Sequence, residues 1–288
     1  MGIVRKVNPS LKWFEAGNYL FLSLISIVVL IPFLNIAAGS LSGGNSILEG
    51  KVSILPVNFT MENYWALLKN FGFWKSFGIT VYITVLGTTL NLTFTSLMAY
   101  GLARRDLKGR STILLIVLFT MIFTAPIIPS YLLVKSLGML NSLWAVMIPS
   151  LISGFNLLIM ISFFQNIPDA LTEAAKIDGS NEYRTFWSIV LPLSMPVMTT
   201  IGLFYAVSNW NGYYAAMMYL RDPGLFPLQV KLRQLITQDN AGDILTSLSS
   251  AEGIKMAAII VATLPVMMIY PFIQKHFVKG AMIGSVKG

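Results

Sequence analysis

Few residues of this 288-residue chain could do chemistry, and their spacing does not form a catalytic set. Cysteine is absent, which excludes thiol catalysis and zinc–thiolate sites. His276 is the only histidine, and a surface position beside Lys275 is the simplest interpretation of it. The G-x-x-x-x-G-K-[ST] loop that binds nucleotide phosphates does not occur. We therefore expect no catalytic residue, no metal site and no cofactor bound by this chain.

One polar segment, Glu173–Pro192, interrupts a chain that is otherwise mostly apolar. Around its start, Leu171, Ala174 and Ala175 recur at helical spacing and predict a short amphipathic helix. Gly179 suits a turn after this helix, because glycine leaves the right-handed region at little steric cost. A second amphipathic helix is predicted by residues at i, i+3, i+4 and i+7, which are Tyr183, Phe186, Trp187 and Val190. The segment therefore predicts a helix, a glycine turn and a second helix.

A second group of polar and aromatic side chains could contact a sugar. Aromatic faces can stack on sugar rings, and amide groups can bond sugar hydroxyls. The group consists of Tyr205, Asn209, Trp210, Asn211, Tyr213 and Tyr214. The alternative is an aromatic belt, in which Trp and Tyr anchor a helix at the lipid headgroups. A further polar stripe, made of Asn91, Thr93, Thr95 and Ser96, is better explained by packing between helices than by ligand contact.

The elements that carry these residues follow from the composition, which is 55% hydrophobic and only 11% charged. Soluble domains carry about a quarter charged residues, so this composition indicates a membrane protein. Six largely uncharged runs are long enough to cross a bilayer, which requires about 20 residues each. We predict an all-α membrane protein with six transmembrane helices, near Asn18–Ala38, Phe77–Ala103, Ser111–Ser130, Leu143–Phe164, Leu191–Tyr214 and Lys255–Gln274.

The placement of lysine and arginine predicts the orientation of these spans. With the N-terminus in the cytoplasm, twelve of the 20 basic residues lie on the inner side, and the short loop Arg104–Arg110 is strongly basic. Topology then explains the net charge of +8 better than nucleic-acid binding does. We predict one transmembrane domain, 1–288, with a cytoplasmic N-tail 1–17, an outer loop 39–76, a cytoplasmic loop 165–191, an outer loop 221–253 and a cytoplasmic C-tail 275–288.

The predicted spans also contain hints of a gated pathway. Their interiors lack Asp, Glu, Lys, Arg and His, the groups that ion-coupled transporters place at depth, so energy would enter from outside the membrane domain. Pro126, Pro149 and Pro196 lie within spans, and each would kink its helix and free backbone groups.

The spacing E-A-A, three residues, G, nine residues, I-x-L-P resembles the EAA loop of ATP-binding-cassette importer permeases. An aspartate directly before the glycine, here Asp178 before Gly179, resembles the form that this loop takes in the carbohydrate-uptake branch of that family. The resemblance extends to the outer Asn63–Trp65 segment, the cytoplasmic turn 99–110, the Trp210–Asn211 pair and the C-terminal tail. It implies the type I importer permease fold with a cytoplasmic coupling helix, in a maltose-permease-like subunit of the bacterial cell membrane.

The resemblance also implies partners. These are a second, homologous permease subunit, two cytoplasmic ATPase subunits that bind ATP and magnesium, and an extracellular sugar-binding protein. The substrate would be an oligosaccharide from plant or algal polysaccharide. The coupling helix would seat in a cleft of the ATPase through Glu173, Ala174, Ala175, Asp178 and Gly179, and the tail would reach the ATPase dimer through Gly284 and Lys287. A basic tail held by anionic lipid is the alternative for the last two residues.

Two other functions fit the same spans. One is an importer of the same kind for a solute that is not a sugar, because only the segments that resemble the family argue for sugar. The other is an ATP-independent channel or a membrane scaffold, which would be isolated without an ATPase.

Overall fold

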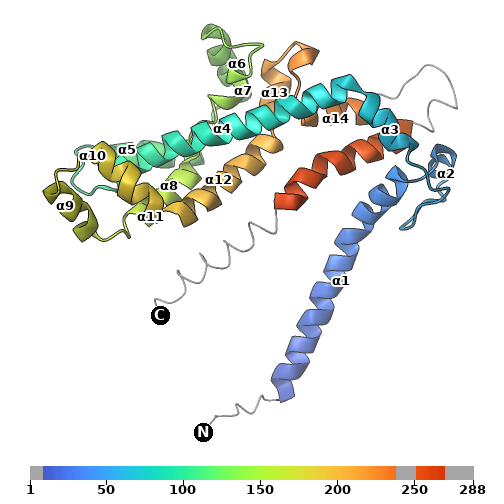
Figure 1. Cartoon of the computed structure of the whole chain (residues 1–288), viewed down its shortest axis with the longest axis horizontal. Coiled ribbons are helices and arrows are strands. Elements are labelled where there is room, and N and C mark those ends of the chain that lie inside the picture. The colour runs from blue at the N-terminus through green and yellow to red at the C-terminus, as the bar shows by residue number, and fades with distance from the viewer. Residues whose placement is uncertain (1–8, 238–250, 270–288) are drawn as a thin grey trace. The chain divides into compact units, whose positions relative to one another are not determined.

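The structure, a computed structural model, describes residues 9–237 and 251–269. Over these residues it consists of helices and their connections, with an isolated β-bridge between Ser42 and Phe59 and no strand (Figure 1). The prediction of an all-α protein is therefore confirmed. The described residues divide into two compact units, one formed by residues 9–70, 235–237 and 251–263 and the other by residues 71–234 and 264–269.

The first unit contains α1, Pro9–Ser40, which is apolar and long enough to span a bilayer from Phe14 onward. Its large apolar side chains are exposed around the whole helix as far as Leu34, as expected of a helix that lies in a membrane. The loop after α1 is held by Asn63, whose Nδ2 donates to the carbonyl oxygens of Ser40 (3.1 Å) and Ser42 (3.0 Å). This loop carries α2, Gly44–Leu48, and α3, Glu62–Lys69.

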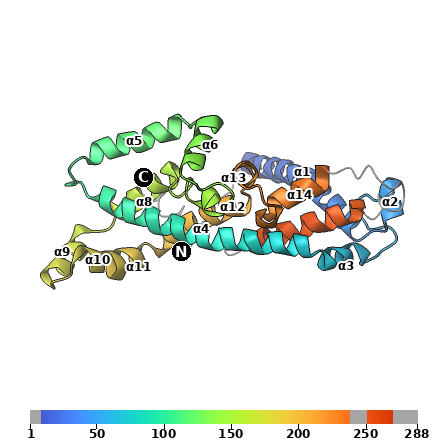
Figure 2. The same ribbon diagram turned by 90° about the horizontal axis from the view of Figure 1, so that it is seen from above.

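The second unit is built around α4, Phe71–Ala103. Two further helices, α8 (Gly154–Phe164) and α12 (Met195–Trp210), pack along α4 (Figures 1 and 2). The core between them consists of Ala99, Leu102, Val117, Leu157, Met160, Ile161, Phe164, Phe186, Val190, Val197, Ile201 and Tyr205. Much of this core lies near the end of α4 at Ala103, so it supports the segment that follows α8.

Three described helices are each long and apolar enough to cross a membrane: Phe14–Ser40, Phe71–Ala103 and Ala251–Ile269. Two bent pairs raise the count to five if each pair is one span. The pair α5 (Arg110–Ile122) and α6 (Ile127–Ser136) is bent by 120°, and the pair Glu182–Leu193 and Met195–Trp210 is bent by 83°.

The remaining predicted span, Leu143–Phe164, is also interrupted. It contains α7, Trp144–Met147, and α8, separated by residues 148–153. The bends expected at Pro126 and Pro149 are therefore present, as full breaks of the helices and not as kinks. Pro126 and Pro149 lie at these breaks, and a proline supplies no N–H to continue a helix.

The outer loop predicted at 221–253 begins after α13, Tyr214–Tyr219. It contains the short 3₁₀ turn Pro223–Leu225 and α14, Leu228–Thr237. The part of this loop between 238 and 250 lies outside the described residues, as do the predicted C-tail 275–288 and the first eight residues of the predicted N-tail.

Candidate functional site

The polar segment after α8 folds as a helix, a glycine turn and a helix, as predicted. The first helix is α9, Asp169–Ile177, and the second is α10, Glu182–Thr185. Gly179 has a φ of +76°, in the left-handed region that glycine adopts without strain. The N–H of Gly179 donates to Lys176 O (3.0 Å) and that of Ser180 to Ala175 O (2.9 Å), which is a Schellman motif. The turn therefore has a defined geometry.

The helix α10 begins at a side-chain cap. Asn181 Oδ1 accepts a hydrogen bond from the Arg184 N–H at 2.8 Å, which satisfies one of the free donors of the first turn. The chain continues through the π-helix Phe186–Val190 and α11, Leu191–Leu193, into α12. Phe186 and Val190 are buried in the core, so the far end of the segment is anchored in the bundle.

The helix α9 turns one small residue inward and leaves an apolar face uncovered. Ala175 is buried, whereas Leu171 and Ala174 are exposed and 87% of Ile177 is exposed. Glu173 is also exposed. An apolar face without a cover, beside a free carboxylate, is suited to bind a partner protein.

A single carboxylate joins this segment to the end of α4. Glu182 Oε2 accepts a hydrogen bond from the Tyr100 hydroxyl at 2.8 Å and forms an ion pair with Arg104. Its Oε1 lies 3.4 Å from Lys176 Nζ of α9. We call Tyr100, Arg104, Lys176 and Glu182 the Glu182 cluster. It links α4, α9 and α10.

Within the Glu182 cluster, each charged group stabilises the charged form of its partner. Partial burial would raise the pKa of Glu182, but the hydrogen bonds from Tyr100 and Arg104, with the charges of Arg104 and Lys176, outweigh it and lower that pKa. Burial would likewise lower the pKa of Arg104, but its bonds to Glu182 and Tyr100 raise it. Both groups are therefore charged at neutral pH.

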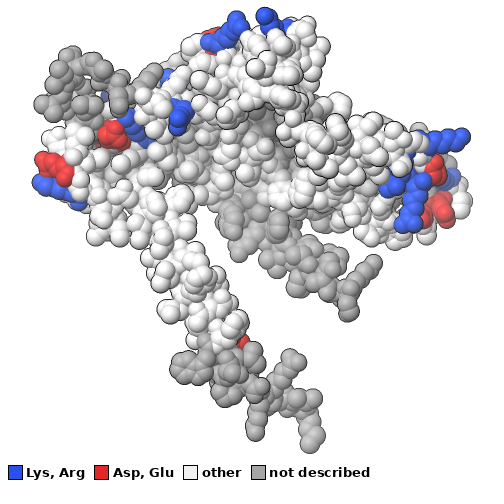
Figure 3. Space-filling model, turned by 180° about the vertical axis from the view of Figure 1, so that it is seen from behind, with Lys and Arg blue, Asp and Glu red and all other residues white. Residues whose placement is uncertain are grey.

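A polar pocket of about 430 Å³ lies beside α9. Charged side chains of both signs gather at this end of the second unit, which is seen from behind at the right of Figure 3. The pocket is open to one side, and it offers hydrogen-bonding and charged groups without a nucleophile paired to a base. Its lining residues are Tyr100, Ala103, Arg104, Arg105, Asp106, Phe164, Gln165, Ile167, Asp169, Thr172, Glu173, Lys176 and Val190.

Of the six aromatic and amide residues predicted to contact a sugar, only Tyr205 and Asn209 border the same cleft. Tyr205 is buried, and its hydroxyl lies 2.8 Å from Thr95 Oγ1 and accepts from the Ser153 N–H at 2.9 Å. Asn209 Nδ2 donates to Thr88 Oγ1 (3.2 Å) and Asn91 Oδ1 (3.1 Å). These two side chains border one polar cleft of about 240 Å³.

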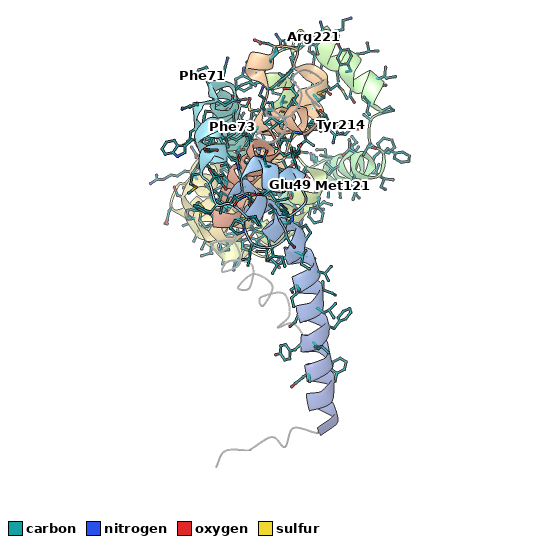
Figure 4. All side chains as sticks on the ribbon, turned by 90° about the vertical axis from the view of Figure 1, so that its right-hand side faces the viewer. Glu49, Phe71, Phe73, Met121, Tyr214 and Arg221 are labelled. Carbon is teal, nitrogen blue, oxygen red and sulfur yellow. The ribbon has the colours of Figure 1, made fainter. Side chains whose placement is uncertain are left out.

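The other four residues of that group lie elsewhere. Trp210 is buried, packs edge-on against Phe77 and lines a separate apolar groove of about 180 Å³. Tyr214, labelled in Figure 4, is the first residue of α13 and is 71% exposed. Asn211 is exposed, and the ring of Tyr213 packs edge-on against that of Tyr214. The six residues therefore do not form one surface, and their role in substrate contact stays a prediction.

The polar stripe on α4 serves packing, as predicted. Asn91 Nδ2 donates to the carbonyl oxygens of Ser150 (2.9 Å) and Leu151 (2.8 Å), and Thr95 bonds Tyr205. Three residues of these sites, Glu182 and Arg104 of the cluster and Asn156 of the cleft beside Tyr205, were not predicted from the sequence. Local patterns could not find the first two, because they are 78 positions apart and only the fold brings them together. Asn156 had one signal, a carboxamide within an apolar run.

Two predicted site residues, Gly284 and Lys287, lie outside the described residues. In the part of the chain that the structure describes, no group of three or more His, Asp or Glu side chains could hold a metal ion.

Comparison with known proteins places these features in a family context. The sequence model of the family described as "binding-protein-dependent transport system inner membrane component" matches residues 91–282. The polygalacturonan/rhamnogalacturonan transport system permease protein YtcP of Bacillus subtilis is 45% identical over 96% of this chain and 99% of its own. The galactooligosaccharides transport system permease protein GanQ of the same organism is 32% identical over 94% and 95%.

The fold also matches a solved structure. A chain in the crystal structure of a bacterial ABC transporter involved in the import of the acidic polysaccharide alginate superposes with a TM-score of 0.88. It is 32% identical in sequence, and the match covers 94% of this chain and 99% of that one. Sequence and fold therefore agree over nearly the whole length.

Proposed function

Because this chain belongs to the family of binding-protein-dependent transport system inner membrane components, we propose that it forms half of the translocation pathway of an ATP-driven importer for oligosaccharides. The names of two relatives give polygalacturonan/rhamnogalacturonan and galactooligosaccharides as the transported sugars, and the similar solved structure belongs to a transporter involved in alginate import. These names support a substrate cut from plant or algal polysaccharide. The chain itself is a membrane-embedded permease with the type I importer permease fold.

The observation that carries the coupling role is the uncovered face of α9. Leu171, Ala174 and Ile177 are exposed apolar groups on a helix that would face the cytoplasm. An ATPase subunit would cover them, and Glu173 would meet a basic group of that subunit. Asp178 and Gly179 shape the turn after the helix. The Glu182 cluster holds the segment against α4, so a pull on α9 would be transmitted to the bundle.

The remaining partners follow from this role. A second permease would complete the pathway, two ATPase subunits would bind ATP and magnesium, and an extracellular protein would deliver the sugar. This chain would contribute no catalytic group, and both its termini would lie in the cytoplasm. Gly284 and Lys287 of the tail would contact the ATPase dimer.

The pathway would pass the polar side of α12. Tyr205 and Asn209 would line it in the middle of the bundle. Asn211, Tyr213 and Tyr214 would lie nearer its outer end, with Trp210 beside them. Tyr205 would act chiefly by holding the wall in place, since its hydroxyl already has two partners.

Reconstitution of the complex tests the proposal. We expect the sugar-binding protein loaded with an oligosaccharide to stimulate ATP hydrolysis in proteoliposomes. Glu173→Lys should reduce this stimulation about tenfold, because it reverses a charge at the docking surface. The matched control is Glu62→Lys, which makes the same change on an exposed residue of α3. Full stimulation in Glu173→Lys, or an equal loss in both variants, would contradict the docking role.

A further inference from the structure

The polar cleft between α8 and α12 is built where the backbone of a predicted span is broken. Its wall consists of Ser150, Ile152, Ser153, Asn156, Phe204, Tyr205, Ser208 and Asn209, with a volume of about 240 Å³. Six of these eight side chains are polar, and none is charged. At about 30 Å³ per molecule, the cleft has room for roughly eight waters.

The break is stabilised by side chains from neighbouring helices. Asn91 donates to the carbonyl oxygens of Ser150 and Leu151, and the Tyr205 hydroxyl accepts from the Ser153 N–H. At membrane depth, irregular backbone is tolerated where it is buried in protein or lines a water-filled cavity. The specific bonds to this break indicate that the opening at the start of α8 is held in shape.

The first turn of α8 borders this opening, because Ser153 and Asn156 both line it. The first N–H groups of a helix have no partner within the helix, and here they follow Ser153, whose side chain does not cap them. The positive end of the helix dipole lies at the same place. An anion is therefore favoured there by geometry.

A second, independent observation comes from Asn156. Only 5% of this residue is exposed, and its carboxamide lines the cleft. The carboxamide makes no hydrogen bond with any group that the structure describes, and its polar atoms are not enclosed by protein, so they are open to the cleft. A carboxamide that faces the cleft without a protein partner has two N–H donors and a carbonyl oxygen available for a group that enters.

We propose that this cleft binds the carboxylate of one acidic sugar unit as the oligosaccharide passes through the membrane. The Asn156 Nδ2 group, the free N–H groups of the first turn of α8 and the Ser153 and Ser208 hydroxyls would donate to the carboxylate oxygens. Neutral donors suit a passing anion, because a fixed cation would hold it too tightly. This inference rests on the proposed transport function and adds the charge of the sugar that the pathway recognises.

The test measures uptake by the reconstituted complex of two labelled probes, trigalacturonate and its fully methyl-esterified form, which carries no charge. Asn156→Asp keeps the shape of the side chain but replaces its NH₂ donor with a carboxyl oxygen, and Asn156→Leu removes both polar groups. Each should lower the ratio of acidic to esterified uptake about tenfold, the factor expected for one lost hydrogen bond to a charged group. Asn45→Asp, on an exposed residue of α2, is the matched control and should leave the ratio unchanged.

The same binding protein is used with every variant, so its own preference cancels when the ratios of variant and wild type are compared. An unchanged ratio in both Asn156 variants, or wild-type uptake of the ester alone, would overturn the carboxylate site while leaving the importer function standing. A wild-type complex that takes up neither probe would overturn this inference alone, whereas a complex whose ATP hydrolysis no oligosaccharide-loaded binding protein stimulates would overturn the proposed function and the inference with it.

Discussion

At the scale of single residues, Glu182 determines how the segment formed by α9 and α10 is attached to α4. Its carboxylate contacts Tyr100 of α4, Arg104 directly after that helix and Lys176 of α9, all three of which line the polar pocket beside α9. Sequence analysis identified the neighbouring Glu173 and Gly179 from their spacing but gave Glu182 no role. A local pattern reports helical faces and turns, and it contains no information on which distant cation a carboxylate will meet.

We expect Glu182→Gln to loosen this attachment without unfolding the protein. The ion pair is partly exposed, so its loss should cost about 1 kcal/mol or less, which corresponds to at most about a fivefold drop in sugar imported per ATP hydrolysed. Simultaneous measurement of uptake and phosphate release checks this. Glu49→Gln, which breaks the exposed ion pair with Lys51, is the matched control and should leave the ratio intact. An equal ratio in wild type and Glu182→Gln would refute the role of the cluster.

The sign of the pH dependence follows from the lowered pKa of Glu182. A carboxylate with a depressed pKa stabilises the fold above its ordinary value of 4.5, and this contribution is lost as the pH falls through the lower folded value. The cluster is therefore intact at neutral pH.

At the scale of elements, hydropathy predicted where apolar helices occur but not where they break. The runs at 111–130 and 143–164 are apolar throughout, and an average over such a run does not change at a bend. The prolines at 126 and 149 carried the signal, yet a proline kinks some helices and ends others. The outcome depends on partners such as Asn91, which accommodates the free carbonyl groups after Pro149.

The helix–turn–helix was predicted more completely because its signals are local. Amphipathic spacing and one glycine were sufficient, since the Schellman motif involves only neighbouring residues. By contrast, the six residues Tyr205 to Tyr214 were grouped by proximity in sequence. They separate in the structure because successive residues of a helix point in different directions, about 100° apart.

We expect Gly179→Pro to abolish retention of the ATPase subunits when the complex is purified. Proline requires a φ near −65° and has no N–H, whereas Gly179 has a φ of +76° and donates to Lys176 O. Gly138→Pro is the matched control, since Gly138 has a φ of +66° and donates to Lys135 O in the same motif after α6. Loss of the ATPase from both variants would point to general misfolding instead.

At the scale of the whole molecule, the proposed function requires a membrane bundle that a separate ATPase subunit moves. The described residues provide a polar cleft at the break before α8 and an uncovered apolar face on α9, at opposite ends of the α8 helix. Work done by a partner on α9 would reach the cleft through α8 and the core that it shares with α4 and α12. The central claim is therefore that α9 is the surface that the ATPase binds.

Site-specific cross-linking tests this claim most directly, because the chain has no native cysteine. A benzophenone maleimide is attached at Ile177→Cys, on the exposed face of α9, or at Leu55→Cys, which is 75% exposed in the loop between α2 and α3. The complex is illuminated in membranes, and the cross-linked subunits are identified by mass spectrometry. The account predicts an adduct with the ATPase from position 177 and none from position 55. An adduct with the ATPase from position 55, or none from position 177 in a complex that hydrolyses ATP, would contradict it.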